Sequence, residues 1–258
     1  MKNLKTKLLV LKQIVLFLTL FTIFSCSSTQ FTVKKVVATK TTVNNNISND
    51  TDIEAYIQPY RTRVDLEMNK ILSIATDNID KSGKWQTPIG NLFSDATLKE
   101  GNSIFEKRQG KKIDICLLNN GGFRANINKG NVTVRTAYEV MPFENKLVVV
   151  ELSADVVEEM ANFIILDKKP HPLAGMTFVI DRNQTAQNIM IHGKPLDKSQ
   201  NYYVATNDYL ANGGDKMDFF KKGASQFDLD YSLRNILIDY CTKNPTLAVP
   251  TDIRISEE

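Results

Sequence analysis

Apolar positions along most of this chain follow two alternating patterns, one typical of helices and one typical of strands. Between Ile53 and Ile71 they recur at steps of three and four residues, which predicts an amphipathic helix. The same spacing predicts further helices at residues 90–100, 154–164 and 231–243. Short apolar runs predict strands at residues 113–120, 146–153, 176–181, 189–193 and 201–207. Helices and strands that alternate in this way predict an α/β fold.

These elements predict a single domain over residues 53–258, and no internal repeat divides it. Since helices and short strands are interleaved, we expect a layered α/β (α+β) domain in which helices pack on mixed sheets. The chain has 258 residues, of which 42% are hydrophobic and 24% charged. This composition is typical of a globular protein with a sizeable core.

The N-terminus has the pattern of a processing signal. Lysines precede an apolar run from Ile14 to Phe24, which is too short to span a bilayer but has the length of a signal-peptide core. The run ends in "IFSC", which resembles a bacterial lipobox, although Phe24 stands where a small residue is usual. We therefore expect residues 1–25 to be a lipoprotein signal peptide and Cys26 to carry the lipid. The alternative is an ordinary secretory signal with an incidental cysteine.

Residues 26–52 are rich in Thr, Ser, Asn and Lys, which predicts a flexible tether between the lipid and the folded domain. A lipid at Cys26 would hold the protein to a membrane of the bacterial cell envelope, on the periplasmic or outer-membrane side. The formal net charge of +3 arises partly from lysines near the N-terminus. The nearly neutral remainder does not favour nucleic-acid binding.

The two remaining cysteines are Cys116 and Cys241. In an exported protein they could form a disulfide, but both lie in apolar patterns, which favours free, buried thiols. Their spacing does not match a cysteine metal site.

Two loops combine glycine or proline with polar and aromatic side chains. In "LNNGGFRAN" (118–126), Gly121 and Gly122 let the backbone approach a ligand, and Asn119 and Arg124 offer an amide and a guanidinium. In "MPFEN" (141–145), Pro142 fixes the turn before the aromatic ring of Phe143. Taken singly, each loop is also compatible with an ordinary turn.

A third loop, "TNDYLANGGDKMDFF" (206–220), has two possible interpretations. Its residues 214–218 have the spacing G-D-x-x-D, which two-metal phosphoesterases use to present carboxylates. It also places Tyr209 six residues before Asp215, across a Gly-Gly pair, which is suited to an aromatic platform with a polar anchor.

In order and spacing these motifs resemble the C-terminal, substrate-recognition domain of the 5'-nucleotidase / UDP-sugar hydrolase family. The resemblance covers about residues 53–255. It rests on "GNLFSDA" at 90–96, N-x-G-G-x-R at 119–124, P-F-x-N at 142–145, and an aromatic-x-x-x-G-G-D sequence that ends at residue 215.

The resemblance implies a nucleoside or nucleotide ligand whose base lies between two aromatic rings, which would here be those of Phe143 and Tyr209. Base stacking of this kind contributes about 1–3 kcal/mol. Asn119 would contact the base, and Arg124 and Asp215 would hold ribose hydroxyls or steer the phosphate. The resulting substrate-binding set is Asn119, Gly121, Gly122, Arg124, Phe143, Asn145, Tyr209, Gly214 and Asp215. This favours the ligand interpretation of the third loop.

The chain departs from the family in two respects. Many members carry an arginine shortly before G-N-L, whereas this chain has Lys84, which could substitute as a point charge, and Trp85, which could add apolar contact. The family hydrolyses phosphate esters with two metals on a separate N-terminal domain, through D-x-H, G-D-x-x-D and G-N-H motifs. This chain has only His171 and His192, which we predict to be surface or turn residues. We therefore expect neither a metal site nor catalytic residues on this chain.

The sequence leaves three hypotheses. The first is the recognition half of a split 5'-nucleotidase, completed by a separate metallophosphatase chain that carries divalent metals and acts in nucleotide catabolism. In the family, the helix from about residue 53 lies where the two domains join, so its exposed start is a candidate docking surface. The second is a non-catalytic envelope protein that binds nucleosides or nucleotides. The third is a structural domain that has lost its pocket.

Overall fold

The computed structural model describes residues 2–23, 33–44 and 47–258. The chain divides into two units, Met1–Thr51 and Asp52–Glu258. The first unit contains one helix, α1 (Lys2–Ile23), among its described residues. Within the described residues, no helix is long and apolar enough to cross a membrane. Cys26, the predicted lipidation site, lies outside the described residues.

Helix α2 (Thr51–Met68) corresponds to the helix that the sequence predicts from Ile53. Its apolar side, however, is not part of the core: within the described part of the chain, none of its residues is buried. Tyr56, Tyr60 and Val64 are all exposed. The three- and four-residue spacing therefore predicted the helix correctly, although its apolar residues are not buried.

Because α2 contributes no buried side chain, removing it is expected to cost little stability. Its contacts with later residues include an exposed ion pair between Asp65 and Arg135, and such pairs contribute about 0–1 kcal/mol. We predict that a chain beginning at residue 69 has a free energy of unfolding within about 1 kcal/mol of a chain beginning at residue 47. Urea unfolding of both measures the difference. A loss of several kcal/mol would show that α2 belongs to the folding unit.

Three sheets form the second unit. The largest has the strand order β10-β4-β9-β2-β5 and the others have the orders β11-β1-β3 and β12-β6-β7-β8. The strand bounds are β1 Ile71–Ala75, β2 Ile115–Leu117, β3 Gly130–Thr133, β4 Lys146–Ser153, β5 Leu173–Ala174, β6 Met176–Ile180, β7 Ala186–Ile191, β8 Lys194–Pro195, β9 Asn201–Asn207, β10 Ser225–Ser232, β11 Thr246–Leu247 and β12 Ile255–Glu257.

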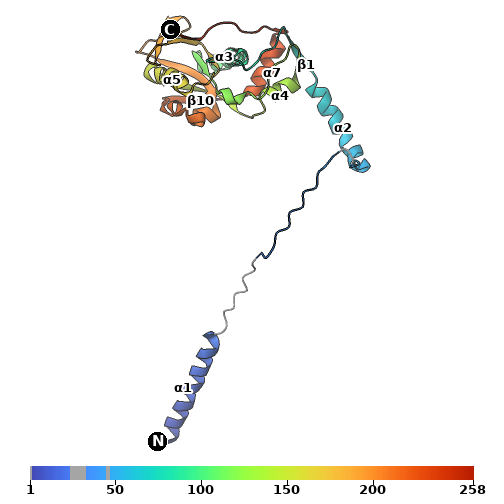
Figure 1. The fold of residues 1–258 in the computed structure, drawn as a ribbon. Helices are drawn as coiled ribbons and strands as arrows, with labels where there is room; N and C mark the ends of the chain where they lie inside the picture. The colour runs from blue at the N-terminus through green and yellow to red at the C-terminus, as the bar shows by residue number, and fades with distance from the viewer. Residues whose placement is uncertain (1, 24–32, 45–46) are drawn as a thin grey trace. The chain divides into compact units, whose positions relative to one another are not determined.

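Helices cover both faces of the largest sheet. After α2, the helices of this unit are α3 (Pro88–Gln109), α4 (Val134–Val140), α5 (Ala154–Asp167), α6 (Asp208–Ala211) and α7 (Leu233–Lys243), with short 3-10 helices η1 (Asn120–Gly122), η2 (Gly214–Lys216) and η3 (Asp218–Lys222). Helices α3 and α7 lie side by side (Figure 1).

Strand β4 separates two hydrophobic cores. Leu147 and Val149 pack into the core that contains residues of α3 and α7, whereas Val148 and Val150 pack into the core that contains residues of α5. Since successive strand residues point to opposite faces, a continuous apolar run indicates a strand that is buried on both sides. The layered α/β fold predicted from the sequence is confirmed.

Both cysteines of this unit are free and buried, as the apolar patterns indicated. Cys116 lies in β2 and Cys241 lies in α7. Burial raises the pKa of the Cys116 thiol and raises the pKa of Cys241 to about 12. Both thiols are therefore unreactive at neutral pH.

Candidate functional site

The register of the largest sheet brings the three loops singled out from the sequence together at one end of its central strands. Strand β2 runs parallel to β9, and β4 runs antiparallel to β9, with Leu147 opposite Asn207. The ends of β2 and β9 therefore lie beside the start of β4. The N-x-G-G-x-R loop follows β2, the P-F-x-N loop precedes β4, and the loop that carries Tyr209 follows β9.

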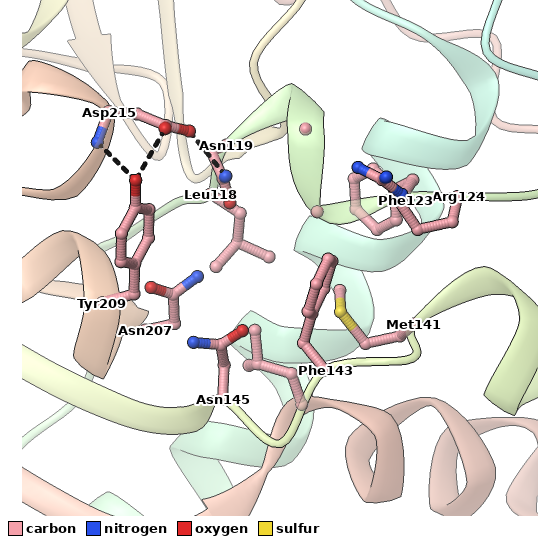
Figure 2. Close-up of a pocket in the computed structure, with 13 residues that line it drawn as sticks. Leu118, Asn119, Phe123, Arg124, Met141, Phe143, Asn145, Asn207, Tyr209 and Asp215 are labelled. Atoms are coloured by element: carbon pink, nitrogen blue, oxygen red, sulfur yellow. Dashed lines mark hydrogen bonds between the residues drawn. The ribbon is translucent and has the colours of Figure 1, made fainter. Parts of the chain in front are cut away.

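These loops enclose a cavity of about 370 Å³ (Figure 2). Of the residues proposed from sequence, all except Gly214 line it. The lining consists of Leu118, Asn119, Gly121, Gly122, Phe123, Arg124, Met141, Phe143, Asn145, Asn207, Tyr209, Asp215 and Leu233.

The aromatic rings of Phe143 and Tyr209 lie on opposite sides of the cavity (Figure 2). The two residues are 41% and 48% exposed, so neither is part of the hydrophobic core. The Arg124 guanidinium lies 5.7 Å from the centre of the Phe143 ring, within the range of a cation–π contact. Both rings are thus accessible from the cavity.

Asp215 connects two of the loops through its carboxylate. Tyr209 donates its hydroxyl to Oδ1 at 2.9 Å, and the Asn119 side-chain amide donates to Oδ2 at 2.7 Å. The backbone N–H of Asp215 donates to the Tyr209 hydroxyl at 3.1 Å. Asp215 has a φ of 50°, a left-handed conformation that is uncommon for residues other than glycine and clusters at functional sites.

The loop that carries Phe143 is held from behind by Arg234 of α7. The Arg234 guanidinium forms an ion pair with Glu144 and lies 4.0 Å from the centre of the Tyr138 ring. Asn145 donates its side-chain amide to Asp208 at 3.0 Å. The sequence motifs do not contain Arg234, because it comes from a helix that is distant in the chain. An arginine in an amphipathic helix does not by itself indicate a site residue.

The apolar floor of the cavity and Asn207 were also missed from sequence. Leu118, Met141 and Leu233 are core-like residues whose pattern indicates only burial. Asn207 ends β9, and its side-chain oxygen accepts from the N–H of Leu210 at 2.8 Å as the cap of α6. A strand followed by Asn at a helix start is the signal that could have identified it.

Two expectations need correction. Neither Lys84 nor Trp85 lines the cavity: Lys84 forms an ion pair with Glu257 at 2.6 Å, and Trp85 is buried in the core that contains α5. His171 lies in the segment between α5 and β5, as expected, but it is not a surface residue, since only 2% of it is exposed. His192, by contrast, is exposed in a turn after β7, as predicted.

The G-D-x-x-D segment does not have the arrangement of a metal site. Asp215 is bonded to Asn119 and Tyr209, and Asp218 forms an ion pair with Lys221 at 2.7 Å. Among the described residues there is no group of three or more His, Cys, Asp or Glu side chains placed to hold a metal ion. The residues present therefore do not fit the two-metal centre of phosphoesterases.

Gly214 shapes the cavity without lining it. A Cβ at this position would lie 2.4 Å from a carbon of the Tyr209 ring. We predict that Gly214→Ala displaces the ring and weakens binding of a stacked ligand by about fivefold to a hundredfold, the contribution of one stacked ring. Calorimetry with adenosine measures the effect, and Gly193→Ala, whose Cβ would have open space in a turn outside the cavity, is the control for a glycine-to-alanine change as such. Equal affinity for Gly214→Ala and the unmodified domain would contradict this role.

The fold and the site together define a layered α/β domain in which three loops enclose a cavity between two partly exposed aromatic rings. The family described as 5'-nucleotidase, C-terminal domain matches residues 70–222. The chain belongs to this family.

The chain is also similar to solved structures and to curated proteins. The crystal structure of a 5'-nucleotidase precursor from Thermus thermophilus is 25% identical, with a TM-score of 0.66 over 80% of this chain and 42% of its own. An apyrase of Anopheles gambiae is 27% identical over 80% of this chain and 38% of its own. A cell wall protein of Listeria monocytogenes is 26% identical over 69% of this chain and 25% of its own. The chain thus spans less than half the length of each relative.

Proposed function

We propose that this domain binds a nucleoside or nucleotide, with the base stacked between Phe143 and Tyr209. The observation that carries the proposal is the pair of exposed rings on opposite sides of a cavity, one of them fixed by Asp215. Stacking tolerates any base because every base has a π-face. In this proposal Asn119, which donates to Asp215 and lines the cavity, contacts the base edge.

The other polar groups suit the sugar and phosphate. Arg124 lines the cavity beside Phe143 and supplies a forked cation of the kind that binds phosphate oxygens. The carboxylate of Asp215 and the amide of Asn145 offer hydrogen-bonding groups to ribose hydroxyls. Gly121 and Gly122 allow the ligand to approach the backbone of the loop.

We further propose that the domain is the recognition half of a split 5'-nucleotidase. The sequence contains two histidines and neither a D-x-H nor a G-N-H motif, so hydrolysis would need a metallophosphatase chain that carries the divalent metals. The exposed residues Tyr56, Tyr60 and Val64 of α2 support an apolar docking surface for such a partner. The alternative is that the domain binds its ligand without taking part in hydrolysis.

The place of action that we propose is the bacterial cell envelope, with the chain held to a membrane by a lipid on Cys26. The apolar run followed by "IFSC" supports lipidation. The similarity to a Listeria cell wall protein supports an envelope location.

Mixing experiments test the split-enzyme proposal. Residues 47–258 are incubated with AMP and Mn²⁺, alone and with an exported metallophosphatase of the same organism, and phosphate release is measured. We expect release only with the partner, and less release when the partner is combined with Phe143→Ala. AMP hydrolysis by residues 47–258 alone, lost on Asp215→Ala or Asp218→Ala, would contradict the proposal. Nucleoside binding without any effect on the partner would favour the non-catalytic alternative.

A further inference from the structure

The single buried histidine of the described chain lies directly behind the N-x-G-G-x-R loop. His171 follows α5 in a short segment, residues 168–172, that runs beside residues 118–120. Two hydrogen bonds join the segments. The N–H of Leu118 donates to the carbonyl of Pro172 at 2.9 Å, and the N–H of Asn120 donates to Nδ1 of His171 at 3.3 Å.

The other side of the His171 ring is fixed by α5. Nε2 lies 2.9 Å from a carboxylate oxygen of Asp167, the last residue of that helix, and the Phe163 ring packs 6.1 Å away, centre to centre. Since Nδ1 accepts from a backbone N–H, the proton of the neutral ring must be on Nε2, which donates it to Asp167. Each ring nitrogen of His171 therefore has one defined partner.

The loop that His171 supports is the one that presents Asn119 and both glycines to the cavity. Asn120 begins η1, and its neighbours Asn119 and Gly121 line the cavity. The Asn119 side chain is fixed from the front by Asp215, and the following backbone N–H is fixed from behind by His171. Loss of the rear contact would leave a donor without its acceptor and free the loop to move.

We propose that neutral His171 is a positioning residue for ligand binding: by accepting the Asn120 N–H while donating to Asp167, it holds the N-x-G-G-x-R loop in its binding conformation. This inference rests on the proposed function of the cavity. His171 acts through the loop and does not touch the ligand, because it does not line the cavity.

The arrangement makes binding sensitive to acid. A proton on Nδ1 removes the acceptor, so affinity is full when His171 is neutral and falls as the pH drops through its pKa. Burial lowers that pKa from 6.5, while Asp167 raises it; Lys169 lowers it, and Asp215 raises it from the cavity side. The decline therefore lies below pH 6.5.

The test is the affinity of residues 47–258 for adenosine, measured by calorimetry from about pH 5 to about pH 8, the range in which histidine titrates. Four variants accompany the unmodified domain. His171→Phe keeps a ring but removes the acceptor, and His171→Asn keeps an acceptor that does not titrate. Asp167→Asn removes the charge that raises the His171 pKa. His192→Asn changes the chain's other histidine, which is exposed and has a φ of 48° that asparagine tolerates.

We expect His171→Phe to bind about tenfold more weakly at neutral pH, the value of one hydrogen bond, with a flat pH profile. His171→Asn should bind like the unmodified domain at neutral pH but lose the acid decline. Asp167→Asn should move the decline to lower pH, and His192→Asn should leave it in place. A decline that persists in His171→Asn, or that disappears in His192→Asn, would overturn the inference.

A ligand-independent measurement separates this inference from the proposed function. If the unmodified domain binds no nucleoside, the proposed function has failed, and amide exchange by NMR in the free protein still tests the loop. We expect the Asn120 amide to exchange at least about tenfold faster in His171→Phe than in the unmodified domain, since its acceptor is gone. Equal exchange rates would overturn the positioning role in that case as well.

Discussion

Replacing Phe143 with alanine is expected to weaken adenosine binding by about fivefold to a hundredfold, because one face of the base loses its stacking partner. Phe143 contributes little to the core, since 41% of it is exposed, so the free energy of unfolding should stay nearly constant. A large effect on binding with a small effect on stability distinguishes a ligand-binding ring from a buried one. Calorimetry and urea unfolding of the same preparation measure both quantities.

Two further variants make the Phe143 experiment specific. Phe143→Trp retains a stacking face and should bind within a fewfold of the unmodified domain. Tyr56→Ala removes an exposed ring of α2 that lies outside the cavity, and it should not change the affinity. If Phe143→Ala bound adenosine as tightly as Tyr56→Ala does, the base would not be stacked on Phe143.

Asp215→Asn is the second change for which we expect a large effect. Asparagine accepts the left-handed backbone conformation, so the loop should keep its path. The variant loses the negative charge, and because an amide has only one oxygen, Asn119 and Tyr209 no longer each donate to a carboxylate oxygen of residue 215. Hydrogen bonds to charged groups contribute about 1.5–3 kcal/mol, which predicts affinity lower by about tenfold to a hundredfold.

Asp218→Asn is the matched control for Asp215→Asn. Asp218 is the second carboxylate of the G-D-x-x-D spacing, but it is exposed, bonds to Lys221 and does not line the cavity. A ligand site centred on Asp215 predicts that only the first substitution lowers adenosine affinity. Equal losses in both variants, together with a requirement for Mn²⁺, would instead show that the two carboxylates bind a metal together.

Elements with a strong periodicity were predicted from the sequence, whereas β1, β3, α4 and β10 were among those that were not. The strand 201–207 has the same bounds in the structure as in the prediction. The helix predicted to begin at Gly90 begins at Pro88, since Thr87 is its cap and accepts from the N–H of Gly90. Proline is common at the first position of a helix, but the predicted start was set at the motif "GNL" and so missed Pro88.

The site was predicted as far as its motifs extend along the chain. Residues that act from behind the loops were missed, because contacts between distant segments leave no local spacing. Arg234 and His171 each contact a loop that lies more than fifty residues away in the chain. Only the fold brings these residues and loops together. For Lys84 and Trp85 the reverse holds: they precede a motif in sequence, yet an ion pair and core packing hold them elsewhere.

The central claim is that the cavity binds a nucleobase, and a calorimetric titration of residues 47–258 with adenosine and with AMP tests it most directly. Saturable binding of both ligands at one site, weakened in Phe143→Ala, is the expected result. Tighter binding of AMP than of adenosine would add support for Arg124 at the phosphate. No binding of either ligand up to about millimolar concentration, which corresponds to about −4 kcal/mol, would contradict the claim for the isolated domain.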